Sequence, residues 1–268
     1  MTSDEIKDEI LQRLRQAEQQ HGVRVLYAVE AGEHAWGFAP PGGVHEVRFV
    51  YAHPRDWYLS VDLEARAGAI ECEAKDGVKL SGQDVRQALS LLWKSNPLFV
   101  EWLHSPLVYR HEGPFAEGAR TLLAKLYSVE ESVHHYLRMA ERDYHGYLKA
   151  QLVPLERYFR VLRPLLAIRW LERYRSPPPV EFELLRELVA DNATVSKDIA
   201  RLLARRAGGQ EKAFIPAMTH LNEFIGNELA RFSRYQPPAV EVSDADMAAL
   251  NTLFRDCLAS AEETDGQG

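Results

Sequence analysis

The first fifty residues alternate between two hydrophobic periods. Apolar side chains recur at helical spacing over residues 4–20, which predicts an amphipathic helix that Gly22 ends. The segment 23–30 (VRVLYAVE) is almost wholly apolar and predicts a buried strand. Residues 44–51 (VHEVRFVY) then alternate with period two. We assign one set of side chains to the core and the other set to solvent or a site. The core set is His45, Val47, Phe49 and Tyr51, and the outer set is Val44, Glu46 and Arg48.

The rest of the chain changes from mixed to helical character. A third strand is predicted around 68–75, followed by a helix over 81–94 with Ser81 as its N-cap. Beyond Asn96 the periodicity is almost entirely helical, and Pro154 and Pro164 should kink or split the fourth of these helices. The predicted helices span 98–104, 115–126, 129–146, 149–175, 181–206, 211–232 and 244–261.

This pattern predicts an α+β protein with two domains. A mixed-sheet domain is expected over residues 1–126, an all-helical domain over 127–262, and a disordered tail over 263–268.

Composition is that of an ordinary globular protein. The chain has 268 residues, of which 46% are hydrophobic and 26% charged, and only two cysteines, Cys72 and Cys257. No apolar run approaches the roughly 20 residues of a membrane span, and no leader precedes the first helix, so we expect a cytoplasmic protein without membrane contact.

Charge is spread unevenly along the chain. The formal net charge of −7 disfavours indiscriminate nucleic-acid binding. Residues 138–175 nevertheless hold nine Arg or Lys against four acids, and residues 241–268 hold seven acids against one arginine. A basic middle could bind an anionic ligand, although solvated helix faces are the commoner explanation.

Four segments carry a family resemblance. They are GEHAWGF at 32–38, VRFVYAHPRDWYLS at 47–60, WKSNPLFVEWLHSPLVY at 93–109 and YFRVLRPLLAIRWLE at 158–172. In order and spacing they resemble the bacterial polymerase-β-like nucleotidyltransferases of the RNA-repair pathway, from about residue 7 to about residue 182. The resemblance implies a nucleotidyltransferase fold followed by a helical domain, with nucleoside triphosphates and RNA ends as substrates.

The site that the resemblance implies is degenerate in this chain. In the family, a Gly-Ser turn holds the triphosphate, and an Asp-x-Asp strand with a third carboxylate binds two magnesium ions. Here Gly32 is kept, but Glu33 stands for the serine, Val44 and Glu46 stand for the aspartates, and Lys79 stands for the third acid. If that last alignment slips, the third acid is Glu71, Glu73 or Asp76.

These departures predict a nucleotidyltransferase homologue that binds a nucleotide, an RNA or a protein partner and needs no cofactor. The rival hypothesis is an active enzyme that uses Glu46 and one of the alternative acids to hold a single magnesium ion. A purely structural subunit is a third possibility. We predict no sequence-specific DNA binding.

The missing metals should be replaced by a cation of the protein itself. We expect the Lys79 ammonium within about 4 Å of the Glu46 carboxylate, with Arg48 as the competing partner. Arg48 could also contact a phosphate.

Further candidates surround these positions. In the helical half, Lys149, Arg157 and Arg163 resemble family positions that could bind phosphate. A relocated metal site built from Glu33, His34, His45 and Glu46 is disfavoured, because His45 and Glu46 point to opposite strand faces. Trp36, Gly37 and Phe38 are expected to pack their loop against the core, a role favoured over base stacking.

Overall fold

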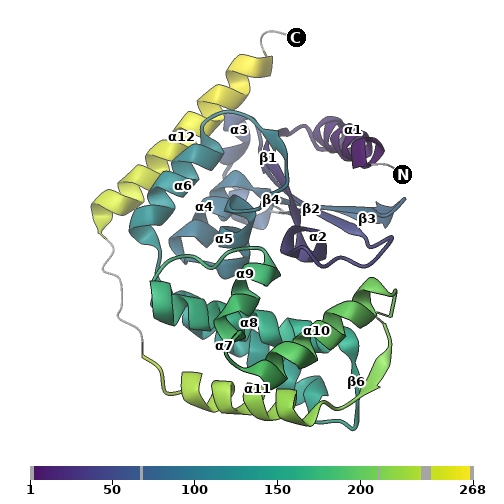
Figure 1. Ribbon diagram of the computed structural model, residues 1–268. Coiled ribbons are helices and arrows are strands. Elements are labelled where there is room, and N and C mark those ends of the chain that lie inside the picture. The colour runs from purple at the N-terminus through teal and green to yellow at the C-terminus, as the bar shows by residue number, and fades with distance from the viewer. Residues whose placement is uncertain (1–2, 67–68, 211, 237–242, 266–268) are drawn as a thin grey trace. The chain divides into compact units, whose positions relative to one another are not determined.

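The computed structural model describes residues 3–66, 69–210, 212–236 and 243–265 (Figure 1). These residues form two compact units. The first comprises the described residues of segments 1–35, 44–126 and 241–268, and the second those of 36–43 and 127–240. Each unit has its own hydrophobic core.

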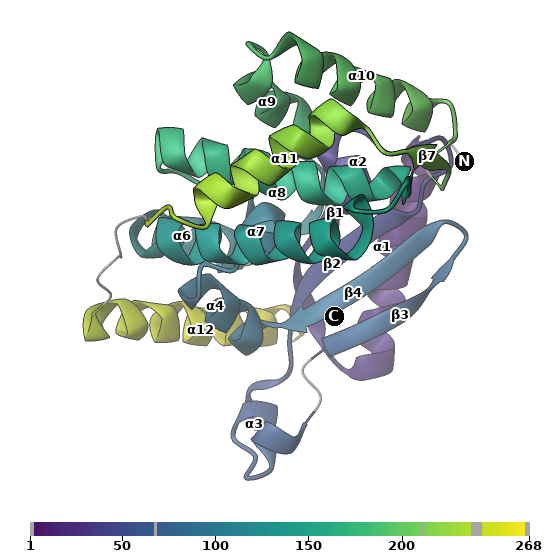
Figure 2. The ribbon, with the colours of Figure 1, turned by 90° about the horizontal axis from the view of Figure 1, so that it is seen from below.

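A five-stranded mixed sheet organises the first unit. Its strands lie in the order β3 (Ala69–Lys75), β4 (Val78–Asp84), β2 (His45–Ala52), β1 (Arg24–Ala31) and β5 (Val108–His111). The pair β2–β4 is parallel, and the other pairs are antiparallel. Figure 2 shows β3 and β4 extending together as a hairpin at one edge. The parallel pair sets Glu46 beside Lys79 and Arg48 beside Ser81.

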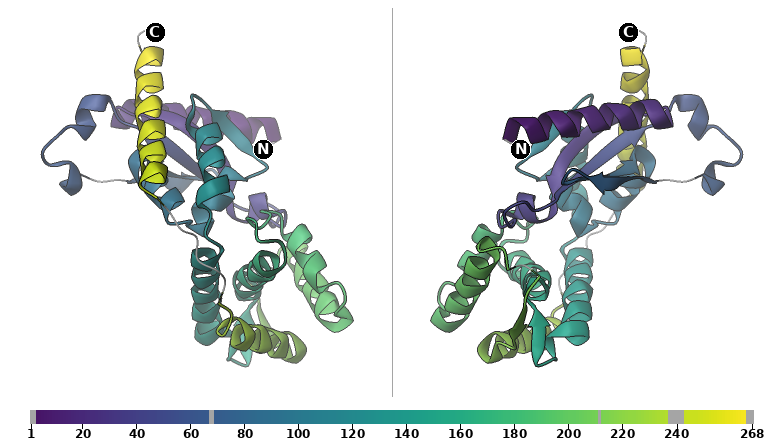
Figure 3. Two further views of the ribbon diagram at one scale, coloured as in Figure 1. Left: turned by 90° about the vertical axis from the view of Figure 1, so that its left-hand side faces the viewer. Right: turned by 90° about the vertical axis from the view of Figure 1, so that its right-hand side faces the viewer.

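Helices cover both faces of this sheet. Helix α1 (Ser3–His21) contributes Ile10, Leu14 and Ala17 to a core that also contains buried side chains of β1, β2 and β4. The two opposed views of Figure 3 show α1 in front of the sheet in one and α12 in front of it in the other. The remaining helices of this unit are α2 (Gly32–Trp36), whose last residue belongs to the second unit, α3 (Arg55–Tyr58), η1 (Leu63–Ala65), α4 (Val85–Trp93), α5 (Pro97–Leu103), α6 (Phe115–Leu126) and α12 (Asp244–Asp265).

The second unit is built around one buried helix. Helix α8 (Leu155–Tyr174) has twelve buried residues and packs along α7 (Val129–Asp143). A π-helical turn, Tyr144–Leu148, continues α7. The other elements are the two-stranded ribbon β6 (Leu152–Pro154) and β7 (Phe214–Pro216), and the helices α9 (Phe182–Arg186), η3 (Glu187–Val189), α10 (Ala193–Ala207) and α11 (Thr219–Phe232). No helix in the described part of the chain is long and apolar enough to cross a membrane.

Most predicted elements are confirmed. The α+β fold, the first helix and the strand faces are as expected, since Val47, Phe49 and Tyr51 are buried while Glu46 and Arg48 are partly exposed. Pro154 marks the start of α8, whereas Pro164 lies inside it without ending it.

The predicted helix over 81–94 is wrong in its first turn. Residues 78–84 form β4, and Asp84, not Ser81, accepts the Arg86 N–H as the N-cap of α4. The strand escapes prediction because Ser81, Gly82 and Gln83 lack β-branched or aromatic character, and pairing with β2 supplies the missing preference. The short strands β5, β6 and β7 were also not predicted.

The units differ from the predicted domains at two segments. Residues 36–43 belong to the helical unit, and residues 241–268 belong to the first unit, where α12 packs on α6 and α4. The closest fit is at Gly118, where an added Cβ would lie 2.4 Å from Leu253 Cδ1. Of the tail predicted over 263–268, residues 263–265 continue α12 and residues 266–268 lie outside the described residues.

Candidate functional site

The turn at Gly32 joins β1 to the short helix α2. Gly32 has a φ of 62°, in the left-handed region that glycine adopts without steric penalty. A Cβ added there would lie 3.1 Å from Glu46 Cδ and 3.2 Å from its Oε2. The Glu46 carboxylate therefore lies directly against the turn that holds the triphosphate in the family that the sequence resembles.

Glu46 has a cationic partner on its own strand. An Arg48 nitrogen lies 3.8 Å from Glu46 Oε2, and the Arg48 guanidinium stands 5.7 Å from the centre of the Trp102 ring. Both side chains are partly exposed, at 29% for Arg48 and 45% for Glu46, so the pair contributes little to stability. Its main effect is to offset the charge of the carboxylate beside Gly32.

The predicted Lys79–Glu46 ion pair is wrong, although the predicted proximity of the two positions is right. Lys79 is the direct neighbour of Glu46 in the parallel pair β2–β4. Its side chain is exposed, and within the described part of the chain Glu46 forms its ion pair with Arg48 instead. Arg48 lies two residues from Glu46 on the same face of β2, so its side chain reaches the carboxylate by running along the strand. The Lys79 side chain is flexible, and its ammonium loses little free energy by staying hydrated instead of pairing with Glu46.

A buried glutamate that sequence reasoning missed lies on β1, next to the strand that carries Glu46. Glu30 is 0% exposed, and its carboxylate accepts hydrogen bonds from His45 Nδ1 at 2.8 Å, from the Glu46 N–H at 2.8 Å and from the Tyr109 hydroxyl. Burial and the contact with Glu30 raise the pKa of Tyr109. The available signal was an acid at the end of the apolar run 23–30, where an unpaired charge would be costly.

The His45 ring also stacks on His34. The ring centres are 3.8 Å apart, with 16° between the ring planes. Since His45 binds Glu30 and faces away from Glu46, the structure does not bring Glu33, His34, His45 and Glu46 together as metal ligands. Among the residues that the structure describes, no three His, Cys, Asp or Glu side chains could hold a metal ion.

The alternative third acids have other partners. Glu71 accepts a hydrogen bond from the Ser81 hydroxyl on the neighbouring strand. Asp76 occupies a left-handed turn position with a φ of 49° and lies 3.6 Å from Arg13. The side chain of Glu73 lies outside the described residues.

These residues do not fit the two magnesium ions that the resemblance implies. Magnesium requires several oxygen ligands in near-octahedral geometry. Val44, at the first aspartate position, is an apolar side chain that is 48% exposed, and Lys79 brings a positive charge to the third position. Glu46 remains as one carboxylate, already opposed by Arg48.

The predicted phosphate-binding residues lie in the helical unit, each with different surroundings. Lys149 is exposed, 5.8 Å from the centre of the Tyr144 ring. Arg157 binds the buried Asp143 at 2.8 Å. Arg163 is 4% exposed, donates to the Val180 carbonyl at 3.2 Å and stands 4.6 Å from the centre of the Trp36 ring. Of these three side chains, Lys149 is the most accessible to a ligand.

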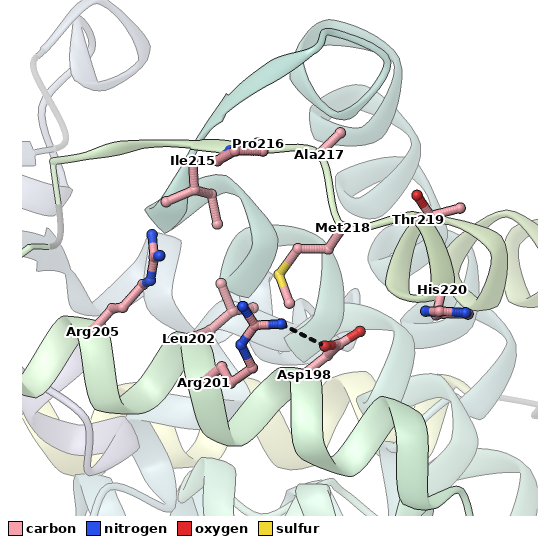
Figure 4. A pocket seen from close by; sticks show the side chains of 10 residues that line it. All are labelled: Asp198, Arg201, Leu202, Arg205, Ile215, Pro216, Ala217, Met218, Thr219 and His220. Atoms are coloured by element: carbon pink, nitrogen blue, oxygen red, sulfur yellow. Dashed lines mark ion pairs between the residues drawn. The ribbon is translucent and has the colours of Figure 1, made fainter.

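A basic pocket that sequence reasoning missed lies in the same unit (Figure 4). It has a volume of about 320 Å³ and lies between α10 and the segment that leads from β7 into α11. Arg201 and Arg205 line it from α10, and His220 lines it from the start of α11. Arg201 stands 3.6 Å from Asp198, whereas Arg205 has no acidic partner among the described residues. The available signal was the i, i+4 spacing of the two arginines, which places them on one helix face.

Comparison with known proteins agrees with the resemblance. The chain matches the family described as "RNA repair pathway DNA polymerase beta family" over residues 6–256. It is 37% identical over 227 residues to "Uncharacterized protein YcgL" of Bacillus subtilis (strain 168), covering 84% of this chain and 86% of that protein. A crystal structure of a nucleotidyltransferase-like protein from Exiguobacterium sibiricum 255-15 aligns with a TM-score of 0.32 and 12% identity, over 96% of this chain and 91% of that one. On the extent of the family match and of the Bacillus relative, the chain belongs to the RNA repair pathway DNA polymerase beta family.

Proposed function

We propose that this family member binds a nucleotide or an RNA without carrying out two-metal nucleotidyl transfer. The observation that carries the proposal is the position of Glu46, which lies against the Gly32 turn and pairs with Arg48. Strand β2 thus presents a carboxylate with its own cationic partner at the place where metal-bound phosphates would lie in an active relative.

The proposal follows from the charge that phosphoryl transfer requires. Two metal ions neutralise the developing charge on the transferred group and its leaving group. Val44 supplies no ligand and Lys79 repels a cation, so the first unit lacks that neutralising centre. The Glu46 carboxylate at the Gly32 turn, whose charge Arg48 offsets only in part from 3.8 Å, would also repel a triphosphate from the backbone N–H groups there.

Phosphate contacts are assigned to the helical unit instead. Lys149 and Arg205 are exposed cations without an acidic partner among the described residues. Arginine suits phosphate through its planar fork of donors, and lysine through its compact charge. Because the formal net charge is −7, phosphate binding should be confined to these basic positions. We propose a cytoplasmic protein that binds nucleic acid neither indiscriminately nor by recognising a DNA sequence.

Transfer is tested by incubating the protein with each labelled nucleoside triphosphate, magnesium or manganese, and an RNA or protein acceptor. We expect no incorporation above background and no change in melting temperature when millimolar magnesium is replaced by a chelator. Incorporation that disappears in Glu46→Ala would establish the rival, an active enzyme with an altered site.

Binding is tested by fluorescence anisotropy with a labelled RNA oligonucleotide, and by calorimetry with a non-hydrolysable nucleotide. We expect Lys149→Glu and Arg205→Glu to weaken binding and to reduce its salt dependence. Arg86→Glu is the matched control, because Arg86 is an exposed arginine of the first unit. Binding of neither ligand by the unmodified protein would overturn the proposal and favour a structural subunit that contacts protein partners.

A further inference from the structure

We propose that the helical unit contains a nucleobase-binding site, which we term the aromatic pocket. This inference rests on the proposed function and names the part of the ligand that the pocket would bind. The pocket has a volume of about 300 Å³, within the roughly 300–1,000 Å³ typical of small-molecule sites. Its lining residues are Trp36, Gly37, Phe38, Ala39, Phe182, Glu183, Leu203 and Ala207.

Three aromatic side chains give the pocket its planar surfaces. The Trp36 and Phe38 ring centres are 5.7 Å apart, and the Phe38 and Phe182 rings are nearly perpendicular with their centres 5.3 Å apart. One face of Phe38 stacks on Phe159, with the ring centres 4.7 Å apart. The side chains of Trp36 and Phe38 are partly exposed, whereas that of Phe182 is fully buried. The sequence favoured simple packing for this loop, yet its two aromatic residues both pack and line a cavity. Aromatic surfaces of this kind bind bases by stacking.

Buried arginines hold these rings in place. The Arg163 guanidinium lies 4.6 Å from the centre of the Trp36 ring. Arg206 is 2% exposed, lies 5.2 Å from the centre of the Phe38 ring and donates through Nε to the Phe38 carbonyl at 3.0 Å. The Trp36 and Phe38 rings are therefore held in position before a ligand binds, which lowers the entropic cost of binding.

The charge of the pocket distinguishes a base from a phosphate. Glu183 is its one charged lining residue, and no lysine or arginine lines it. Glu183 Oε1 binds Arg186, and Oε2 has no partner among the described residues. A free carboxylate oxygen repels phosphate and accepts a hydrogen bond from an exocyclic amino group. The aromatic pocket therefore suits adenine, cytosine or guanine better than uracil.

The experiment uses nucleosides, which contain no phosphate. Binding of cytidine and uridine, two ligands of nearly equal size, is measured by calorimetry on the full chain. Cytidine should bind more tightly, and Glu183→Gln should narrow the difference, since an amide can also donate to the uracil carbonyl. Ala207→Leu fills the pocket from an exposed helix position and should weaken cytidine binding about tenfold or more.

Ala204→Leu is the matched control, because Ala204 is exposed on the same helix and does not line the pocket. Equal cytidine affinity in the two leucine variants, both folded by circular dichroism, would overturn the inference, as would the absence of nucleoside binding. The proposed function would still stand if RNA bound to the unmodified protein in either case. Nucleoside binding that is lost in Ala207→Leu, without any RNA or nucleotide binding, would support the aromatic pocket and overturn the proposed function.

Discussion

His45 Nδ1 forms a 2.8 Å hydrogen bond with the wholly buried carboxylate of Glu30, which lies on β1 beside the strand that carries Glu46. The same carboxylate accepts the Glu46 N–H, so Glu30 ties the start of β2 to the end of β1. A carboxylate in this position holds the strand that bears the candidate site in register.

Replacing Glu30 should therefore destabilise the fold. Glu30→Leu removes the shared acceptor of three buried or half-buried donors, and we expect a loss of about 3 kcal/mol or more in the free energy of unfolding. Urea denaturation checks this value. Glu64→Gln is the control, since the Glu64 side chain is 82% exposed and its ion pair should contribute less than about 1 kcal/mol. Equal unfolding midpoints for the two variants would contradict the prediction.

The steric effect of Glu46 on a side chain at position 32 can be measured apart from the cost of the left-handed backbone. Gly22→Ala and Gly32→Ala place a Cβ at nearly the same φ, 61° and 62°, but only the second approaches another side chain. We expect about 1–2 kcal/mol of destabilisation from the backbone in both variants, and an additional loss in Gly32→Ala. That additional loss should vanish when Glu46 is also replaced by alanine. A difference that persists in the double variant would place the steric conflict elsewhere.

Two neighbouring arginines of α10 should differ in how much stability the same substitution removes. Arg206 is buried against Phe38, whereas Arg205 is exposed at the basic pocket. Arg206→Lys loses the planar contact with the ring and the Nε hydrogen bond, so thermal or urea unfolding should show a loss of about 1–3 kcal/mol. Arg205→Lys should leave stability unchanged within about 0.5 kcal/mol. Similar effects for both would contradict the structural role of Arg206.

His53 should contribute to acid sensitivity. Its ring stacks on Trp57 at 3.9 Å, and burial, with Arg66 and His21 nearby, lowers its pKa below 6.5. The unfolded chain therefore takes up a proton at His53 before the folded protein does. As far as His53 is concerned, the free energy of unfolding is highest above pH 6.5 and falls as the pH decreases from 6.5 toward the folded-state pKa of His53.

His53→Gln should flatten this dependence. We expect the unfolding midpoint in urea to fall less between about pH 7.5 and pH 5.5 in the variant than in the unmodified protein, because the linked proton uptake is removed. A His104→Gln variant is the comparison, as His104 is an exposed histidine at the end of α5. Parallel pH profiles for His53→Gln and the unmodified protein would refute the linkage.

Local sequence accounts for the elements and much less well for the site. Period-two and helical spacing identified the core face of β2 and the buried side of α1, because burial there follows directly from position along the chain. Strand β4 was missed because its pairing with β2 comes from residues more than thirty positions away. The partners of Glu30 have the same origin, since His45 and Tyr109 come from two other strands.

The sequence also could not decide which of two nearby cations would pair with an acid. The register placed Lys79 beside Glu46, yet the carboxylate contacts Arg48, which the sequence analysis named as the competing partner. Arg163 was assigned to phosphate by resemblance, and its burial against Trp36 depends on a loop more than a hundred residues earlier. Sequence spacing gives the residues that can meet, and packing decides which of them do.

The order in which segments enter the first unit has a consequence for its synthesis. The helical unit consists of the short loop 36–43 and residues 127–240. Residues 127–240 come after the strands of the sheet and before helix α12 in the chain. On the ribosome, the helical unit can therefore complete its core while the surface of α6 that receives Leu253 is still open. We expect nascent chains that end before residue 244 to resist protease within the helical unit and to be cleaved within the first, a vulnerability that ends only when α12 emerges.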